Sequence, residues 1–289
     1  MRWDEDHQSP DVVDRRGERP QQAGLGGLVY LIPLLLRTRF GWVFLVLGGA
    51  YYAWTQFGEG DRRGASGAQS SERTAPKQDT ELARFVGFVL DDAQDTWTRE
   101  LAASSKRYRR AKLVLFTDAT QTACGFGQAA TGPFYCPADE RVYVDLGFYR
   151  ELEERLGARG DFAQAYVVAH EIGHHVQKVL GVTDRVQALR GNQEGATGTS
   201  VRVELQADCL AGVWAHSAQA RSLLEAGDVE EAMVATAAIG DDRLQRNAKG
   251  TVRPETFTHG SSEQRGRWFR RGLESGKLEA CDTFNAPVL

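Results

Sequence analysis

The stretch AYVVAHEIGHHVQKVL, residues 165–180, is the most informative part of this sequence. Its apolar residues recur at the three- and four-residue spacing of an α-helix. His170 and His174 stand four residues apart, so they lie on one face of that helix, one turn from each other. Two imidazoles at this spacing can hold one zinc ion, and Glu171 can act as a general base on a water molecule. The alternative is a chance motif on a surface helix, which the apolar helical context disfavours.

A second stretch, SVRVELQADCLAGVWAH at residues 200–216, offers a third metal ligand. Catalytic zinc takes three protein ligands and keeps one position open. Glu204 and Asp208 stand four residues apart on a predicted helix, so they share one face. Glu204 would complete a His2Glu set, and Asp208 would accept a hydrogen bond from a ligand imidazole and fix its tautomer. A solvated acidic face is disfavoured because this helix is otherwise apolar.

The remaining histidines are weaker candidates. His259 stands in a loop ahead of a predicted helix and could stabilise the oxyanion of a tetrahedral intermediate. Structural packing is an equal alternative for His259. His175 lies about 100° round the helix from His174, so we expect it to support or pack rather than to share the metal. His216 and His7 carry no expected role.

The chain has four cysteines, and an even number suits two disulfides in a domain that lies outside the cytoplasm. None of them forms the C-x2-C pair that would favour metal ligation. Cys124 with Cys136 would close a short loop, which leaves Cys209 to pair with Cys281. The spacing alone leaves the connectivity open.

From residue 80 to residue 289 the sequence has the pattern of a globular domain. Apolar periodicity predicts helices over residues 80–103, 146–156, 162–180, 201–218, 229–239 and about 262–273. It predicts strands at 112–116 and 142–145. Strands early and helices late favour an α+β domain that is mainly helical with a small sheet. A net charge of −4 without a basic block gives no case for nucleic-acid binding.

The N-terminal region predicts a membrane segment. Residues 40–57 (FGWVFLVLGGAYYAWTQF) carry no acidic or basic side chain and reach the short end of the length that spans a bilayer. Trp42 and Trp54 near the two ends fit interfacial aromatic belts. A buried core helix is the weaker alternative. Residues 1–39 then form a polar segment with an interfacial apolar run, and residues 58–79 form a flexible linker.

The orientation of this segment rests on two weak signals. Arg37 and Arg39 precede the apolar stretch, which favours an N-terminus on the inside. The cysteines favour a catalytic domain on the outside, and together these signals predict a single-pass protein of the cell membrane. The alternative is a hairpin of residues 25–36 with residues 40–57, which would place the domain in the cytoplasm.

The sequence resembles the bacterial neutral zinc metallopeptidases of the YpfJ type over residues 1–17 and most of 117–284. The matching stretches are MRWDEDHQSPDVVDRRG, TGPFYCPADERVYVDL, GDFAQAYVVAHEIGHHVQ, SVRVELQADCLAGVWAH, AIGDDRLQ and FTHGSSEQRGRWFRRG. The resemblance implies a zincin-like catalytic domain preceded by a membrane segment. It also implies His170, His174 and Glu204 as ligands of one zinc ion with Glu171 as the base, a set that looks like that of gluzincins.

These observations predict a membrane-anchored endopeptidase that cleaves protein or peptide substrates. Zinc would polarise the scissile carbonyl and acidify a water molecule, while Glu171 would carry the proton to the leaving amine. In zincins the substrate adds to an edge strand, and residues 125–131 are a candidate for that edge, with a Gly-rich turn as the alternative. Two other functions stay open. One is a non-catalytic membrane adaptor that keeps zinc for folding, and the other is a hydrolase of a non-peptide amide.

Overall fold

The structure is a computed structural model that describes residues 1–18, 77–128, 132–188 and 193–289. Residues Met1–Glu18 and Pro76–Leu289 form one compact unit. The predicted transmembrane helix at 40–57, the apolar run at 25–36 and nearly all of the predicted linker lie outside the described residues. Among the helices that are described, none is both long enough and apolar enough to cross a bilayer.

A four-stranded sheet lies on one side of the unit, in the order β1-β2-β6-β5. Its strands are β1 (Val12–Asp14), β2 (Lys112–Phe116), β5 (Phe134–Cys136) and β6 (Arg141–Asp145). Strands β1, β2 and β6 run parallel, and β5 pairs antiparallel with β6 at the edge. The central strands β2 and β6 are continuous apolar runs because both of their faces are covered. A separate hairpin is formed by β3 (Ala119–Thr122) and β4 (Gly125–Gln128).

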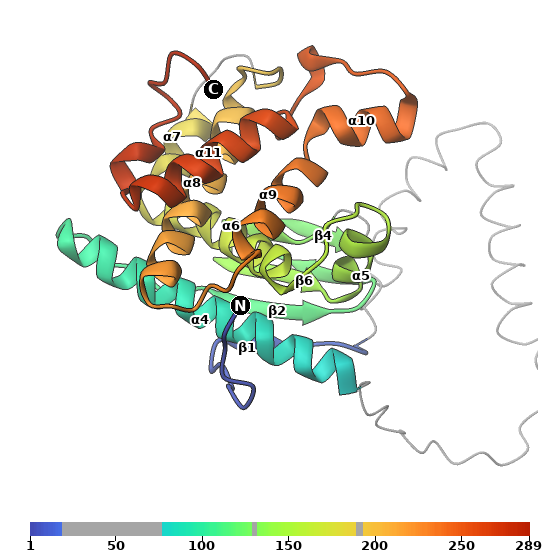
Figure 1. The fold of residues 1–289 in the computed structure, drawn as a ribbon, viewed down its shortest axis with the longest axis vertical. Coiled ribbons are helices and arrows are strands. Elements are labelled where there is room, and N and C mark those ends of the chain that lie inside the picture. The colour runs from blue at the N-terminus through green and yellow to red at the C-terminus, as the bar shows by residue number, and fades with distance from the viewer. Residues whose placement is uncertain (19–76, 129–131, 189–192) are drawn as a thin grey trace, which may run out of the picture. The chain divides into compact units, whose positions relative to one another are not determined.

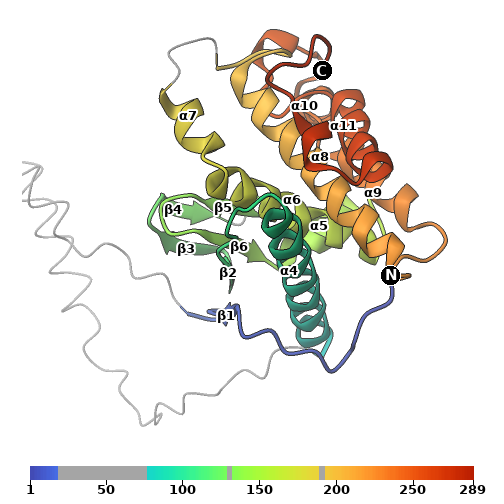
Figure 2. The same cartoon turned by 90° about the vertical axis from the view of Figure 1, so that its left-hand side faces the viewer.

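Helices make up most of the rest of the unit. They are α4 (Lys77–Ala103), α5 (Gly147–Glu154), α6 (Asp161–Val179), α7 (Val182–Ala188), α8 (Thr199–Ala220), α9 (Asp228–Ala238), α10 (Asp241–Lys249) and α11 (Ser262–Ser275). Figures 1 and 2 show α4 and α6 against the sheet, with α8, α9 and α11 beyond α6. The expected α+β class, mainly helical with small sheets, is confirmed. Strand β1 and helix α7 were not predicted because each is too short to show a clear apolar period, and α10 was not predicted because Leu244 and Ala248 are its only apolar residues.

Two glycines let α8 pack very closely against its neighbours on both sides. A Cβ atom on Gly173 of α6 would lie 2.9 Å from the carbonyl oxygen of Ala207 on α8. A Cβ atom on Gly272 of α11 would lie 1.9 Å from the carbonyl oxygen of Cys209. Only glycine permits such backbone contact. The three helices α6, α8 and α11 therefore form one tight stack, and the side chains between them are held at short range.

The first eighteen residues belong to this unit. Strand β1 pairs in parallel with β2, and Asp11 forms ion pairs with Arg110 and Lys112 at 2.5 and 2.7 Å. Arg16 donates a hydrogen bond of 3.0 Å to the carbonyl oxygen of Asp79, near the start of α4. The sequence instead predicts a separate N-terminal region for residues 1–39, because a three-residue strand with two exposed positions carries no periodic signal.

The position of β1 restricts the membrane topology. Strand pairing requires β1 and β2 to lie in the same compartment, since backbone hydrogen bonds join them directly. A single crossing by residues 40–57 would put residues 1–18 and the domain on opposite sides of the bilayer. The single-pass arrangement with an inside N-terminus and an outside domain is therefore incompatible with the fold. Both flanks of residues 19–76 lie on one side of any membrane.

Paired cysteine labelling tests this topology. The side chains of Asp6 and Glu263 are 100% and 80% exposed, and the native cysteines are all disulfide-bonded. We expect Asp6→Cys and Glu263→Cys, made separately, to give the same result with a membrane-impermeant maleimide in intact cells. Lysed cells provide the control that both thiols can react. Labelling of one variant and protection of the other would contradict the shared compartment.

Candidate metal centre

Three side chains from two helices converge at one point. His170 and His174 come from α6, and their ring centroids lie 4.8 Å apart. Glu204 comes from α8, and its two carboxylate oxygens lie 3.2 Å from Nε2 of His170 and 3.5 Å from Nε2 of His174. The possible ligand atoms all lie within 4.8 Å of one another. The structure thus brings together the three residues that the sequence suggests as ligands.

The spacing of these atoms suits a zinc ion. Zinc lies about 2.0–2.2 Å from nitrogen or oxygen ligands in tetrahedral geometry, so two of its ligand atoms are separated by roughly 3.3–3.5 Å. The two distances from Glu204 to the imidazole nitrogens match that separation. Two neutral imidazoles and one carboxylate are also the donor set of a catalytic site that keeps one position open. The residues present therefore fit zinc.

A fully buried carboxylate, Asp208, orients the first imidazole. Its Oδ1 atom accepts a hydrogen bond of 2.8 Å from Nδ1 of His170 and another from the hydroxyl of Tyr166. This contact places the ring proton on Nδ1 and leaves Nε2 facing Glu204 as the donor atom for a metal. Asp208 thus has the supporting position expected from its spacing to Glu204.

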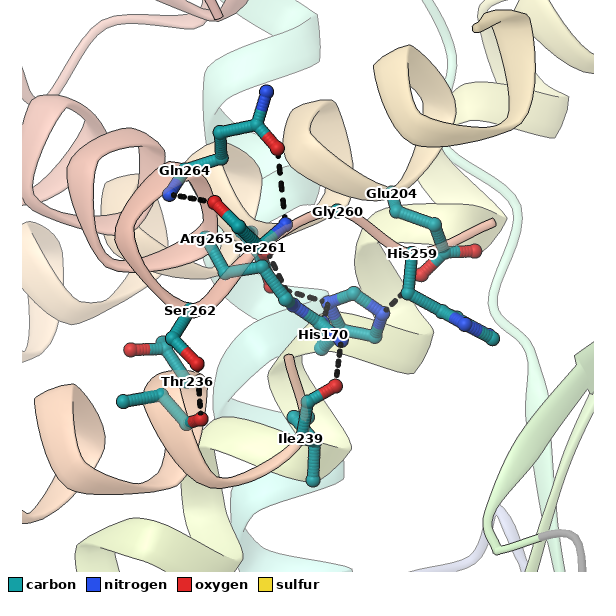
Figure 3. Close-up of polar contacts among 12 residues, drawn as sticks. His170, Glu204, Thr236, Ile239, His259, Gly260, Ser261, Ser262, Gln264 and Arg265 are labelled. Carbon is teal, nitrogen blue, oxygen red and sulfur yellow. Dashed lines mark hydrogen bonds and ion pairs between the residues drawn. The ribbon is translucent and has the colours of Figure 1, made fainter. Parts of the chain in front are cut away.

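Arg265 of α11 is the partner of Asp208 that the sequence reasoning missed. Its Nε and Nη2 atoms donate hydrogen bonds of 2.8 and 2.9 Å to the two oxygens of Asp208, and the side chain is almost fully buried. Figure 3 shows this guanidinium beside His170, with the capping box of Ser261 and Gln264 at the start of α11. The capping-box spacing S-x-x-Q was readable from the sequence. The pairing with Asp208 was not, because nothing local links α11 to α8.

Gln177 supports the second imidazole in the same way. Its Oε1 atom accepts a hydrogen bond of 2.9 Å from Nδ1 of His174. Its amide nitrogen donates to the carbonyl oxygen of Val203 at 2.7 Å, which ties this end of α6 to α8. Gln177 stands three residues after His174, so the helical period of α6 could have indicated the contact.

The charges of the site depend on one another. Burial disfavours the charged form of His170, but Asp208 and Glu204 outweigh burial and raise the pKa of this imidazole to about 9. Burial likewise opposes the charge of Asp208, but Arg265 and His170 lower the pKa of its carboxyl to about 2. Glu204 is affected in the same sense, since the two imidazoles lower its pKa well below the usual value despite burial. Asp208 and Glu204, whose negative charges favour the protonated form of His170, would also favour a divalent cation bound in its place.

Glu171 and His259 face the same space. A pocket of about 930 Å³ is lined by both of them together with the three candidate ligands. Glu171 is buried to 7% exposure, next to His170 on α6. His259 is half exposed, and Nδ1 of its ring lies 3.2 Å from Asp241. The other oxygen of Asp241 accepts hydrogen bonds from the backbone N–H groups of residues 258, 259 and 260, so this carboxylate shapes the loop that carries His259.

His175 lies on the other side of α6 from the metal donors. Its Nε2 atom donates a hydrogen bond of 2.6 Å to the carbonyl oxygen of Arg109, and Nδ1 accepts one of 2.9 Å from the hydroxyl of Tyr135. Burial lowers the pKa of this imidazole, which is consistent with a neutral ring bonded at both nitrogens. His175 joins α6 to the edge strand β5, in agreement with the expected supporting role.

Both expected disulfides are present. Cys124 pairs with Cys136 and joins the β3–β4 turn to strand β5. Cys209 pairs with Cys281 and ties α8, next to Asp208, to the C-terminal segment. The cysteines therefore stabilise the frame around the pocket and take no part in the candidate metal site.

The chain is similar to known proteins over its whole length. A protein family described as "Putative neutral zinc metallopeptidase" matches residues 1–284. "Uncharacterized protein YpfJ" of Escherichia coli K12 is 44% identical over 300 aligned residues that cover the whole of both chains. "Uncharacterized protein Rv2575" of Mycobacterium tuberculosis H37Rv is 45% identical over 193 residues, which are 63% of this chain and 65% of the relative. No solved structure matches the chain.

The chain belongs to the neutral zinc metallopeptidase family, which implies a zinc cofactor. The zincin fold expected from the resemblance has no support from a solved structure.

The contact between Arg265 and Asp208 gives a stability prediction. Arg265→Met should lower the free energy of unfolding by about 3–5 kcal/mol, because it leaves the charge of Asp208 buried without its cation. Arg270→Met on the same helix is the matched control, since Arg270 is exposed; it should cost less than about 1 kcal/mol. Urea denaturation of the metal-free proteins measures both values. Equal losses in the two variants would contradict the assignment.

Proposed function

We propose that this protein is a zinc-dependent endopeptidase with one zinc ion per chain, held by His170, His174 and Glu204. The observation that carries the proposal is the convergence of these three side chains, whose possible ligand atoms all lie within 4.8 Å of one another. The two oxygens of Glu204 lie 3.2 and 3.5 Å from the Nε2 atoms of the two histidines, which suits tetrahedral zinc. Glu171 lines the same pocket. Membership in the neutral zinc metallopeptidase family supports the same reaction class.

Glu171 is the general base in this proposal. When bound, the zinc ion supplies a Lewis acid for the scissile carbonyl and acidifies a water molecule. Glu171 follows the ligand His170 on α6 and faces the pocket, where it takes the proton from the attacking water and gives it to the leaving amine. Asp208 and Gln177 act through the imidazoles. By accepting hydrogen bonds at Nδ1, they keep both Nε2 atoms free for the metal.

His259 is the proposed donor to the oxyanion of the tetrahedral intermediate. Its ring is half exposed at the pocket wall, and Asp241 holds both the ring and the loop. Burial opposes the charge of Asp241, but hydrogen bonds from His259 lower the pKa of this carboxyl, so Asp241 stays ionised near neutral pH. The ionised carboxylate accepts a hydrogen bond from Nδ1–H and so orients the ring with Nε2 on the side away from Asp241. Nε2 can then donate to an oxyanion when the ring is in its imidazolium form, which carries a proton on both nitrogens.

The shape and charge of the pocket favour internal cleavage of a peptide chain. Its lining includes residues 133–135 at β5, the edge of the sheet, where an extended peptide could add as a further strand. The sequence suggested residues 125–131 as the edge, and the described part of that stretch is β4 (Gly125–Gln128). This strand lies in the separate hairpin and does not contribute to the described lining. Among the described lining residues, Arg265 is paired with Asp208 and Arg155 with Glu151, which leaves no cation to hold a C-terminal carboxylate.

The alternative function is a non-catalytic membrane adaptor that keeps zinc for folding. Structural zinc sites are usually closed by four protein ligands. Among the described residues only three side chains meet at this point, and they open into a pocket lined by an acidic side chain. These features favour catalysis over a purely structural ion. A non-peptide amide substrate would need the same chemistry, and the extended pocket beside a free strand edge favours a peptide.

We further propose that residues 40–57 attach the protein to the cell membrane and that the domain lies in an oxidising compartment outside the cytoplasm. The apolar length of this segment supports attachment, and two disulfides support the compartment. Because β1 belongs to the domain, residues 1–18 share that compartment. The cysteine labelling described above, carried out after the protein is located in washed membranes, tests both statements.

Glu171→Gln tests the reaction. The variant should keep stoichiometric zinc and lose peptide hydrolysis, because the amide cannot take a proton while the ligands are unchanged. Glu230→Gln, at an exposed position of α9 that does not line the pocket, is the control that should retain activity. Zinc content by atomic emission and cleavage of unfolded casein give the two readouts. If Glu171→Gln hydrolyses peptides at the wild-type rate, another residue must be the base. If the variant is inactive but cells that carry it behave like wild-type cells, the adaptor function is favoured.

His259→Ala tests the proposed oxyanion donor. Loss of one such donor should lower kcat by about 10²–10³-fold with little change in KM. Zinc content and thermal stability should stay near wild-type values, because the ring is half exposed and contacts no ligand side chain of the site. Steady-state kinetics on a peptide that wild-type protein cleaves provide the measurement. An unchanged kcat would assign His259 to packing alone.

A further inference from the structure

The two disulfides of this protein differ in how far solvent can reach them. Cys209 and Cys281 are both buried, with exposed fractions of 0% and 1%. Cys124, in contrast, is exposed, and its partner Cys136 is completely buried. Thiol–disulfide exchange begins when a thiolate attacks one sulfur atom of a disulfide, so it requires access to that atom. A reductant in solution can therefore reach the Cys124–Cys136 disulfide, whereas the other disulfide is protected.

The Cys124–Cys136 disulfide holds one wall of the pocket. Cys136 is the last residue of β5, and Tyr135 and Pro137 on either side of it line the pocket that contains the candidate metal site. Cys124 stands in the turn between β3 and β4, and this hairpin lies beside β5 in Figure 2. The disulfide thus joins the turn of the hairpin to the pocket wall.

Strand β5 is short and lies at the edge of the sheet, where it pairs with β6 over three residues. Phe134 stacks on Tyr143 of β6 with ring centroids 5.0 Å apart. Tyr135 donates its hydrogen bond to Nδ1 of His175 on α6. The hairpin touches the ring of Phe134, because a Cβ atom on Gly127 would lie 2.5 Å from it. The position of β5 therefore depends on these contacts and on the disulfide that fixes the hairpin beside it.

The crosslink has a large effect on a segment of this length. Cys124 and Cys136 are 12 residues apart. In the chain-entropy model, closing such a loop shifts the equilibrium between ordered and open conformations by on the order of 100-fold. The candidate ligands His170, His174 and Glu204 stand on α6 and α8, and the buried disulfide holds α8. Reduction of the exposed disulfide should thus loosen the pocket wall and leave the metal donors in place.

We propose that the Cys124–Cys136 disulfide is a redox switch that controls substrate binding in this pocket. This inference rests on the proposed peptidase function for the activity that is controlled. A thiolate of a dithiol reductant attacks Sγ of Cys124 and forms a mixed disulfide, while Cys136 leaves as a thiolate and takes up a proton. The second thiol of the reductant then attacks the reductant's own sulfur in the mixed disulfide and releases Cys124 as a thiol. Two electrons and two protons pass from the dithiol, which becomes a disulfide, to the two cysteines.

The oxidised protein is the active form in this switch. Residues 133–135 at β5 are the place where we propose that an extended peptide adds as a further strand, so a mobile β5 weakens substrate binding. Glu171 and the candidate ligands stand on helices of the core, so the chemical step changes less. Reduction should therefore raise KM more than it lowers kcat, and a dithiol in the surrounding compartment would turn the protein off.

Partial reduction of full-length, zinc-loaded protein tests the switch. The protein is treated with reduced dithiothreitol, which is then removed by anaerobic gel filtration into a buffer that contains zinc. Alkylation and mass spectrometry of an aliquot should show that Cys124 and Cys136 react before Cys209 and Cys281. At that stage kcat/KM for a peptide that the untreated protein cleaves should be lower by about 10-fold or more, mainly through KM. Zinc content should be unchanged, and reoxidation should restore the activity.

The double variant Cys124→Ser/Cys136→Ala is the matched control. It lacks the crosslink, so its KM should equal that of the reduced wild-type protein and should not respond to dithiothreitol. Any effect of the reductant on the zinc ion would appear in this variant as well. Hydrogen exchange gives a second measurement that needs no peptide cleavage. The backbone amides of β5 should exchange about 10-fold faster or more in the reduced protein and in the double variant than in the oxidised protein.

The outcomes separate the switch from the peptidase function. In an active protein, a KM that does not rise on selective reduction would overturn the switch. Unchanged hydrogen exchange of β5, or reduction of the Cys209–Cys281 disulfide first, would overturn it whether or not the protein is active. If β5 exchanges faster on reduction but neither form cleaves a peptide, the proposed peptidase function fails and the disulfide remains a redox control of the pocket wall.

Discussion

The site depends on the hydrogen bonds that the buried carboxylate of Asp208 accepts from neighbouring helices. It receives hydrogen bonds from His170 of α6, Tyr166 of α6 and Arg265 of α11, while it stands on α8 itself. An isolated carboxylate at this depth would be very costly to bury, so the contact is favourable only when all three helices are in place. Gly173 and Gly272 allow the close approach that this requires. The same helix stack therefore aligns the candidate metal donors and fixes the tautomer of His170.

The domain is built from two separate segments of the chain, residues 1–18 and the part that follows residue 76. Residues 1–18 supply an outer parallel strand and the carboxylate of Asp11, and the domain resumes at α4 after residues 19–76. A hydrophobic segment that separates two parts of one folded unit must begin and end on the same side of a bilayer. This constraint comes from the backbone pairing of β1 with β2, and it applies to any membrane attachment through residues 19–76.

Much of the site could be predicted because helical spacing is a local property. His170, Glu171 and His174 share one turn of α6, and Glu204 with Asp208 share one turn of α8, so the sequence indicated both groups. The helices at 80–103 and 162–180 were predicted closely for the same reason, since their apolar period is long. Strand β1, helix α10 and the partners Arg265 and Gln177 were not predicted. Strand β1, α10 and Arg265 depend on contacts between distant segments or lie in elements with too few apolar residues to show a period. Gln177 stands three residues after His174, so the helical period could have indicated its contact.

The sequence by itself determined the chemistry: the kinds of metal donor, the candidate base, and the helical faces that present them. The tertiary structure decided what those faces meet. It placed α8 between α6 and α11, so that Glu204 joins the two histidines and Arg265 neutralises Asp208. It also put β5, rather than the glycine-rich residues 125–128, at the wall of the pocket. Residue spacing along a helix is set by backbone geometry alone, whereas contacts between elements are set by packing of the whole unit.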